Sequence, residues 1–178
     1  TALGFNALGD TTTSNNNTAI GSYAMYDGVG SSECVAVGVS ALANNTAANN
    51  TAVGYVALTT NSTGTRNTAV GKGALDVMDT GSDSTALGFN ALGAHTGAAA
   101  TAVGAECMAL NTGSQNSGFG YGALTTNSTG GYNTAIGYQS LYLNNGTSNT
   151  AVGTTALDAN TTGTQNTAVG RDALGASQ

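Results

Sequence analysis

Three aspartates, Asp76, Asp79 and Asp83, form the densest group of carboxylates in this 178-residue sequence. Carboxylate oxygens are preferred ligands of Ca²⁺, and three of them on one loop could begin its shell of six to eight oxygens. The spacing D-x-x-D-x-G-x-x-D matches neither an EF-hand nor the G-G-x-G-x-D repeat of calcium β-rolls. The spacing therefore favours a solvated loop, with a structural Ca²⁺ site at these residues as the alternative.

The residue types needed for catalysis are present but not grouped. A glycosidase needs two carboxyl groups roughly 5–10 Å apart, whereas Glu33 and Glu106, the only glutamates, occupy unrelated positions of the repeat described below. His95 is the only histidine and has neither a Ser–His–Asp arrangement nor a second zinc ligand beside it. We expect His95 to be an exposed turn residue. The sequence predicts no enzyme, no catalytic residue and no cofactor.

Aromatic side chains recur directly after a glycine. Phe5, Tyr55, Phe89, Tyr121 and Tyr138 share this position, and Tyr23 lies one place further on. They are expected to form a broken stripe, which could contact a receptor or a glycan, or fill a groove between subunits. The absence of Trp argues against glycan binding. The subunit groove is the favoured interpretation.

These residues are carried by a tandem repeat that runs through the whole chain. Its copies begin at residues 1, 18, 35, 51, 68, 85, 101, 117, 134, 150 and 167, each with a phrase of the Thr-Ala-apolar-Gly type. Positions are numbered below as columns from the first residue of each copy, and the consensus is T-A-[VIL]-G-x-x-A-L with a polar Asn/Thr/Gly tail. Helical spacing is absent. The pattern predicts an all-β fold in one domain over 1–178, a parallel β-solenoid of eleven coils with two strands per coil, about 50 Å long.

Alternation within the strand divides the columns between two faces. Columns one and three are expected to face the core, because column three is always apolar and Val35 replaces Thr in column one. Column two, almost always Ala, would then face outward and pack against another subunit. The invariant Gly of column four marks a position where a Cβ is not allowed. Leu or Met in column eight should begin the second strand. A further column is expected to form an asparagine ladder: Asn45, Asn61, Asn111, Asn127, Asn144 and Asn160.

Charge and cysteine content exclude several classes of function. The net charge is −6 with three cations, so a nucleic-acid interface is excluded and an anionic membrane surface is disfavoured. No apolar run is long enough to insert in a membrane. Cys34 and Cys107 lie four coils apart, too far for a disulfide. Because the sequence lacks an initiator Met and starts and stops inside repeats, we expect a fragment of a longer fibre.

The phrase Asn67-Thr68-Ala69-Val70-Gly71 resembles the YadA-like head repeat of trimeric autotransporter adhesins, and the fuller pattern is similar to the repeat region of bacteriophage tail-fibre proteins. The resemblance implies a left-handed β-roll, a homotrimeric rod, and attachment to a host-surface receptor or glycan from a cell surface or virion. Two alternatives are a self-assembling extracellular filament and an ice-binding β-solenoid. The latter requires an exposed Thr column, and the expected burial of column one argues against it.

Overall fold

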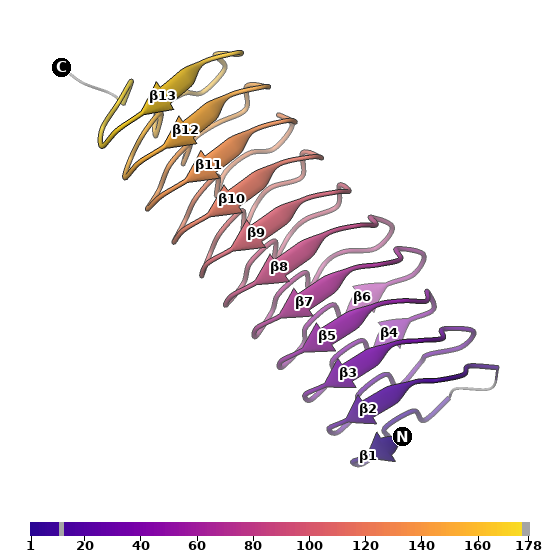
Figure 1. Ribbon diagram of the computed structural model, residues 1–178. Helices are drawn as coiled ribbons and strands as arrows, with labels where there is room; N and C mark the ends of the chain where they lie inside the picture. The colour runs from indigo at the N-terminus through magenta and orange to yellow at the C-terminus, as the bar shows by residue number, and fades with distance from the viewer. Residues whose placement is uncertain (11–12, 176–178) are drawn as a thin grey trace.

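A computed structural model describes residues 1–10 and 13–175 of the chain. The described residues form a parallel β-solenoid that contains no helix, and so none that could cross a membrane. Figure 1 shows one strand of each coil stacked in a nearly straight row, with the two termini at opposite ends of the rod. The eleven-stranded sheet has the order β1-β2-β3-β5-β7-β8-β9-β10-β11-β12-β13. Its strands are β1 (Ala2–Leu3), β2 (Thr18–Ile20), β3 (Val35–Val37), β5 (Thr51–Val53), β7 (Thr68–Val70), β8 (Thr85–Leu87), β9 (Thr101–Val103), β10 (Ser117–Phe119), β11 (Thr134–Ile136), β12 (Thr150–Val152) and β13 (Thr167–Val169).

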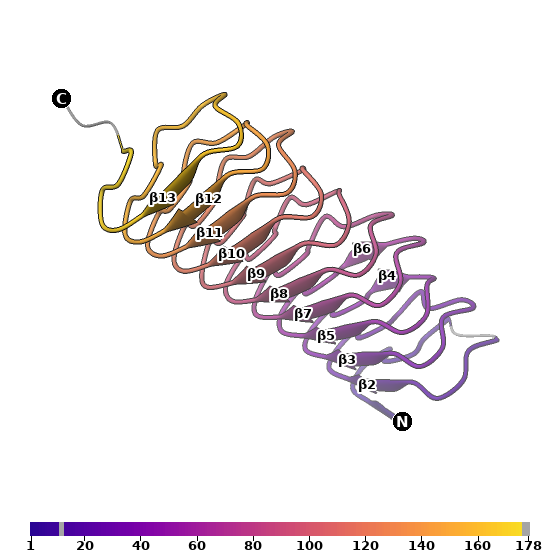
Figure 2. The same ribbon diagram turned by 45° about the horizontal axis from the view of Figure 1, so that its top comes forward.

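Each copy of the repeat stacks on the next in register. In β5 and β7, for example, Thr51 pairs with Thr68 and Val53 with Val70, and the strands are parallel. Backbone hydrogen bonds connect a coil to both neighbours: Gly71 N–H donates to the carbonyl of Val53 at 2.8 Å, and Leu58 N–H to that of Ala74 at 2.9 Å. The turned view of Figure 2 shows the loops of successive coils following one another in the same way. Residues of one column therefore form a line along the rod.

The core lies on the face of the sheet opposite to the predicted one. Column two is buried, with Ala19, Ala52 and Ala135 fully inaccessible, whereas columns one and three are half-buried or exposed. The predicted burial of columns one and three, and the outward subunit contact of the Ala column, are thus wrong. The reason is the width of the coil, because the Ala and Leu of columns seven and eight fill the interior and leave room for only a methyl group on the opposing strand.

The substitution in coil eight shows how narrow the interior is. Gly118 occupies column two there, and a Cβ at this position would lie 2.7 Å from Cys107 Sγ and 2.8 Å from Met108 Cε. Coil seven carries Cys107 and Met108 where most coils have Ala and Leu, so the larger pair is accommodated by a smaller neighbour. Both cysteines are free, as expected from their separation. Both are also buried, and burial raises the pKa of the Cys107 thiol to about 12.

A turn replaces the predicted second strand in most described coils. Only β4 (Asn44–Asn45) and β6 (Thr60–Asn61) form a second sheet. Columns six and eight adopt left-handed backbone angles, as in Val56 (φ 50°) and Leu58 (φ 49°), which ends the alternation of a strand. Because of this turn, the adjacent residues of columns seven and eight, such as Ala57 and Leu58, are both buried.

Candidate functional site

The outward surface of the eleven-stranded sheet is formed by columns one and three. Column three is apolar in every coil and largely open: Leu87 is 47% exposed, Ile136 41% and Phe119 40%. No charged residue occurs in columns one to three of any coil. An uncharged, apolar face that spans eleven strands is unusual on a chain with a net charge of −6. We name columns one and three the sheet face.

The aromatic residues of column five lie along one edge of the sheet face and are exposed, from 49% for Tyr138 to 66% for Phe5. The stripe is broken, as predicted. The rings of Tyr121 and Tyr138 stack with their centroids 5.6 Å apart. Lys72, in the same column, places its Nζ 5.8 Å from the ring centroids of both Tyr55 and Phe89, in cation–π contact. Phe5 contacts Tyr23 edge to face at 5.4 Å.

The candidate calcium site is not assembled. Asp83 forms an ion pair with Arg66, whose Nε and Nη2 donate to its two carboxylate oxygens at 2.6 and 2.8 Å, and this pair lowers the pKa of Asp83. Asp79 instead accepts a hydrogen bond from the Ser62 hydroxyl. Over the described part of the chain, no three His, Cys, Asp or Glu side chains come together in a way that could hold a metal ion. Asp76, Asp79 and Asp83 therefore act as separate surface carboxylates.

Asparagine side chains fill the interior at the polar end of most described coils. In the predicted column they join neighbouring coils in pairs: Asn61 donates to Asn45 at 2.6 Å, Asn127 to Asn111 at 2.8 Å and Asn160 to Asn144 at 2.8 Å. The predicted ladder is thus present as three separate links. Met78 and His95 occupy the column between the first and second links.

A second asparagine column, directly before the Thr of each phrase, was not predicted. Its members are Asn17, Asn50, Asn67, Asn116, Asn133, Asn149 and Asn166. All of them except Asn166 accept a hydrogen bond from a backbone N–H of the next coil; the Oδ1 of Asn116, for instance, accepts from the N–H of Asn133 at 2.9 Å. The frequent N-T-A phrase was the signal in the sequence. It did not lead to a prediction of buried asparagines, because Asn is common throughout the tail and composition does not show which asparagines are buried.

The expected exposure of His95 is wrong. The side chain is fully buried in the asparagine column, with Nδ1 2.8 Å from the carbonyl oxygen of Asn111 and Nε2 without a partner. Burial lowers the pKa of His95, and the bond to Asn111 only partly opposes this. A neutral, buried imidazole with an unpaired nitrogen is a structural weak point of the rod.

The rod should lose stability in mild acid because of His95. Its folded pKa lies below the unfolded value of about 6.5, so below that pH the unfolded chain takes up a proton that the folded chain refuses, until the folded pKa is reached. We expect the unfolding free energy to fall by at most about 1.4 kcal/mol per pH unit below pH ~6.5. Urea unfolding at graded pH values between 7.5 and 5.5 measures this slope.

His95→Asn is the matched control. Asn111 occupies the same column in the next coil, where its amide donates to the carbonyl of Gly113 at 3.1 Å. An asparagine at position 95 would have the equivalent carbonyl, that of Gly97, available in coil six. The variant should be at least as stable as the parent chain at pH 7.5 and should lose the slope. A slope that persists in His95→Asn would show that another group causes it.

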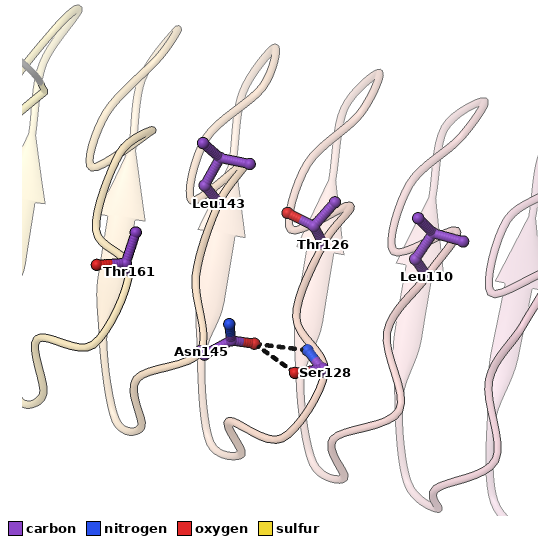
Figure 3. A pocket seen from close by; sticks show the side chains of 6 residues that line it. All are labelled: Leu110, Thr126, Ser128, Leu143, Asn145 and Thr161. Atoms are coloured by element: carbon purple, nitrogen blue, oxygen red, sulfur yellow. Dashed lines mark hydrogen bonds between the residues drawn. The ribbon is translucent and has the colours of Figure 1, made fainter.

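A groove with a volume of about 370 Å³ lies on the surface away from the sheet face. Figure 3 shows Thr126 between Leu110 and Leu143 in one row, with Asn145 accepting hydrogen bonds from Ser128 below them. Thr161 completes the lining. The lining contains hydroxyl, amide and aliphatic groups but no titratable side chain, so it offers no acid, base or activated nucleophile.

Comparison with known proteins identifies no relative. No family model matches the chain, and neither any curated protein nor any solved structure matches it significantly.

Proposed function

We propose that this chain is a rigid segment of an extracellular fibre, a surface adhesin or phage tail fibre, in which three copies associate through the sheet face. The observation that carries the proposal is the exposed apolar column three on an uncharged sheet of eleven strands. The rod serves as a spacer or attachment element and has no catalytic role. The phrase formed by residues 67–71 resembles the adhesin head repeat, which supports the same assignment.

The chemistry of the sheet face suits a second copy of the chain. All nine carboxylates lie outside columns one to three, so like-charged copies can approach there without burying a charge. The sheet face together with its column-five edge is about 50 Å long and 15 Å wide, which gives on the order of 800 Å² per subunit, the area of a standard stable interface. The aromatic edge of column five would then lie at the rim of the interface.

Charge placed on the sheet face should separate the subunits without unfolding the coil. Val70 and Val103 point away from the core, so the double variant Val70→Asp/Val103→Asp would bury two carboxylates from each of the three chains in the assembly but none in the monomer. We expect sedimentation velocity to show an oligomer for the parent chain and a 17.2 kDa monomer for the variant, with the same β-type circular dichroism spectrum.

The matched control is Val77→Asp, because Val77 is 51% exposed and lies in the loop region away from the sheet face. This variant should assemble like the parent chain. Equal assembly of the sheet-face variant and the control would refute the proposed interface. End-to-end growth that rises with concentration would favour the self-assembling filament instead.

Ice binding is a second candidate. The argument against it was the expected burial of the Thr residues in column one, and these residues point outward. Thr51, Thr68 and Thr85 repeat along the rod about every 4.8 Å on an uncharged face. Against it, column three varies from Val to Phe and Val35 interrupts the Thr column, which an interface tolerates better than a lattice match does. A thermal-hysteresis gap in a monomeric sample would favour ice binding, and its absence would leave the fibre.

A further inference from the structure

A notch of about 260 Å³ opens on the turn surface of coils seven to nine. It arises where column six, occupied by Glu106 in coil seven and Gln139 in coil nine, holds Gly122 in coil eight. The missing side chain leaves a gap between a carboxylate and an amide. Thr125 and the rings of Tyr121 and Tyr142 complete the lining.

The lining groups are held in place by hydrogen bonds and by ring stacking. The Nδ2 of Asn90 donates to Oε2 of Glu106 at 2.8 Å, which fixes the carboxylate. The hydroxyl of Thr125 donates to the Gly122 carbonyl at 2.8 Å. Tyr121 is stacked on Tyr138 on one side. On its other side the same column holds Ala105, whose methyl group is too small to cover the ring. One aromatic face is therefore open beside fixed polar groups.

We propose that this notch binds a single pyranose residue of a neutral glycan. A sugar ring presents an apolar face that packs on an aromatic ring, and hydroxyl groups that both donate and accept hydrogen bonds. Tyr121 supplies the ring, Glu106 accepts from hydroxyls, and Gln139 can donate and accept. The volume lies just below the range for drug-sized ligands, which suits one ring rather than a chain. The site deepens the attachment role proposed above and rests on it.

The variant Gly122→Asn fills the notch with a residue type that already occurs in column six. Asn6 and Asn90 occupy column six elsewhere, both with φ 52°, close to the φ of +62° at Gly122. The nearest atom to a new Cβ is Cγ of Gln139, a side-chain atom at 3.3 Å. Gly73→Asn is the matched control, because Gly73 is the other glycine of the column (φ +67°) and does not line the notch.

Saturation-transfer NMR tests the site with three probes: methyl β-galactopyranoside, methyl α-mannopyranoside and methyl β-glucopyranoside. At least one should bind the parent chain and the Gly73→Asn variant, and its binding to Gly122→Asn should weaken by about tenfold or more. Failure of all three to bind, or equal binding to the parent chain and to Gly122→Asn, would overturn the proposal.

The solution mass of the same samples separates this proposal from the fibre. An oligomer that binds none of the sugars would overturn the notch and leave the assembly intact. A monomer whose sugar binding is abolished by Gly122→Asn would support the notch and overturn the fibre.

Discussion

Replacement of Gly54 by alanine is expected to destabilise the chain by about 3–5 kcal/mol. Two costs combine at this position. The backbone has φ +141°, a region that residues with a Cβ rarely adopt, and the new Cβ would lie 2.5 Å from the carbonyl oxygen of Gly71 in the next coil. The obstacle is backbone, so it cannot turn aside as a side chain would. Urea unfolding followed by circular dichroism measures the loss.

The control for this prediction is Gly170→Ala. Gly170 has the same strained backbone, φ +126°, but its Cβ would meet only the Ala173 methyl at 3.9 Å. This variant should show the conformational cost, roughly 1–3 kcal/mol, without the clash. Equal losses in the two variants would mean that the close approach between coils contributes nothing to the invariance of column four.

Asn116→Ala is the second change with a large expected effect, a loss of about 2–4 kcal/mol. The buried side chain donates to the Gly130 carbonyl at 2.8 Å and to Asn111 Oδ1 at 3.2 Å, and accepts from the Asn133 N–H at 2.9 Å. Alanine would leave these groups buried without partners. Unfolding midpoints report the total loss, and hydrogen exchange at the Asn133 amide reports whether it arises at this link.

The variant Asn116→Ser separates the hydrogen bond to the Asn133 amide from the bonds that Asn116 donates to Gly130 and Asn111. Ser84 occupies the same column, and its hydroxyl accepts from the Ala100 N–H at 3.3 Å, so a serine can preserve that contact. The Asn133 amide should remain protected in Asn116→Ser and exchange faster in Asn116→Ala. Similar exchange in both variants would argue against the side-chain link.

Repeat length and the invariant columns were sufficient to predict the parallel β-solenoid and one of its two asparagine columns, because strict periodicity leaves few ways to stack coils. The direction of the strand faces could not be predicted by hydrophobicity alone. Val70 is larger and more apolar than Ala69, yet Ala69 is buried and Val70 is not. The larger apolar residue of a strand usually faces the core, but the interior of this coil is too narrow for a valine. That width depends on the folded coil and cannot be read from the hydrophobic pattern.

The candidate site was less predictable. The broken stripe of column-five aromatics could be predicted, since these residues follow a glycine of fixed position, and they are exposed on the single chain. His95 was misplaced because a lone histidine in a polar tail looks like a turn residue, whereas its column is filled by buried asparagine in the next coil, at Asn111. The notch at Gly122 depends on three neighbouring coils at once, which no single repeat displays.

The solution mass of the unmodified chain, measured by light scattering over a range of concentrations, tests the central claim most directly. If the sheet face joins three subunits, the mass is three times that of the 17.2 kDa chain and stays constant on dilution to the micromolar range. A mass of 17.2 kDa at all concentrations would contradict the account, because an apolar face of eleven strands would then remain exposed without a partner copy.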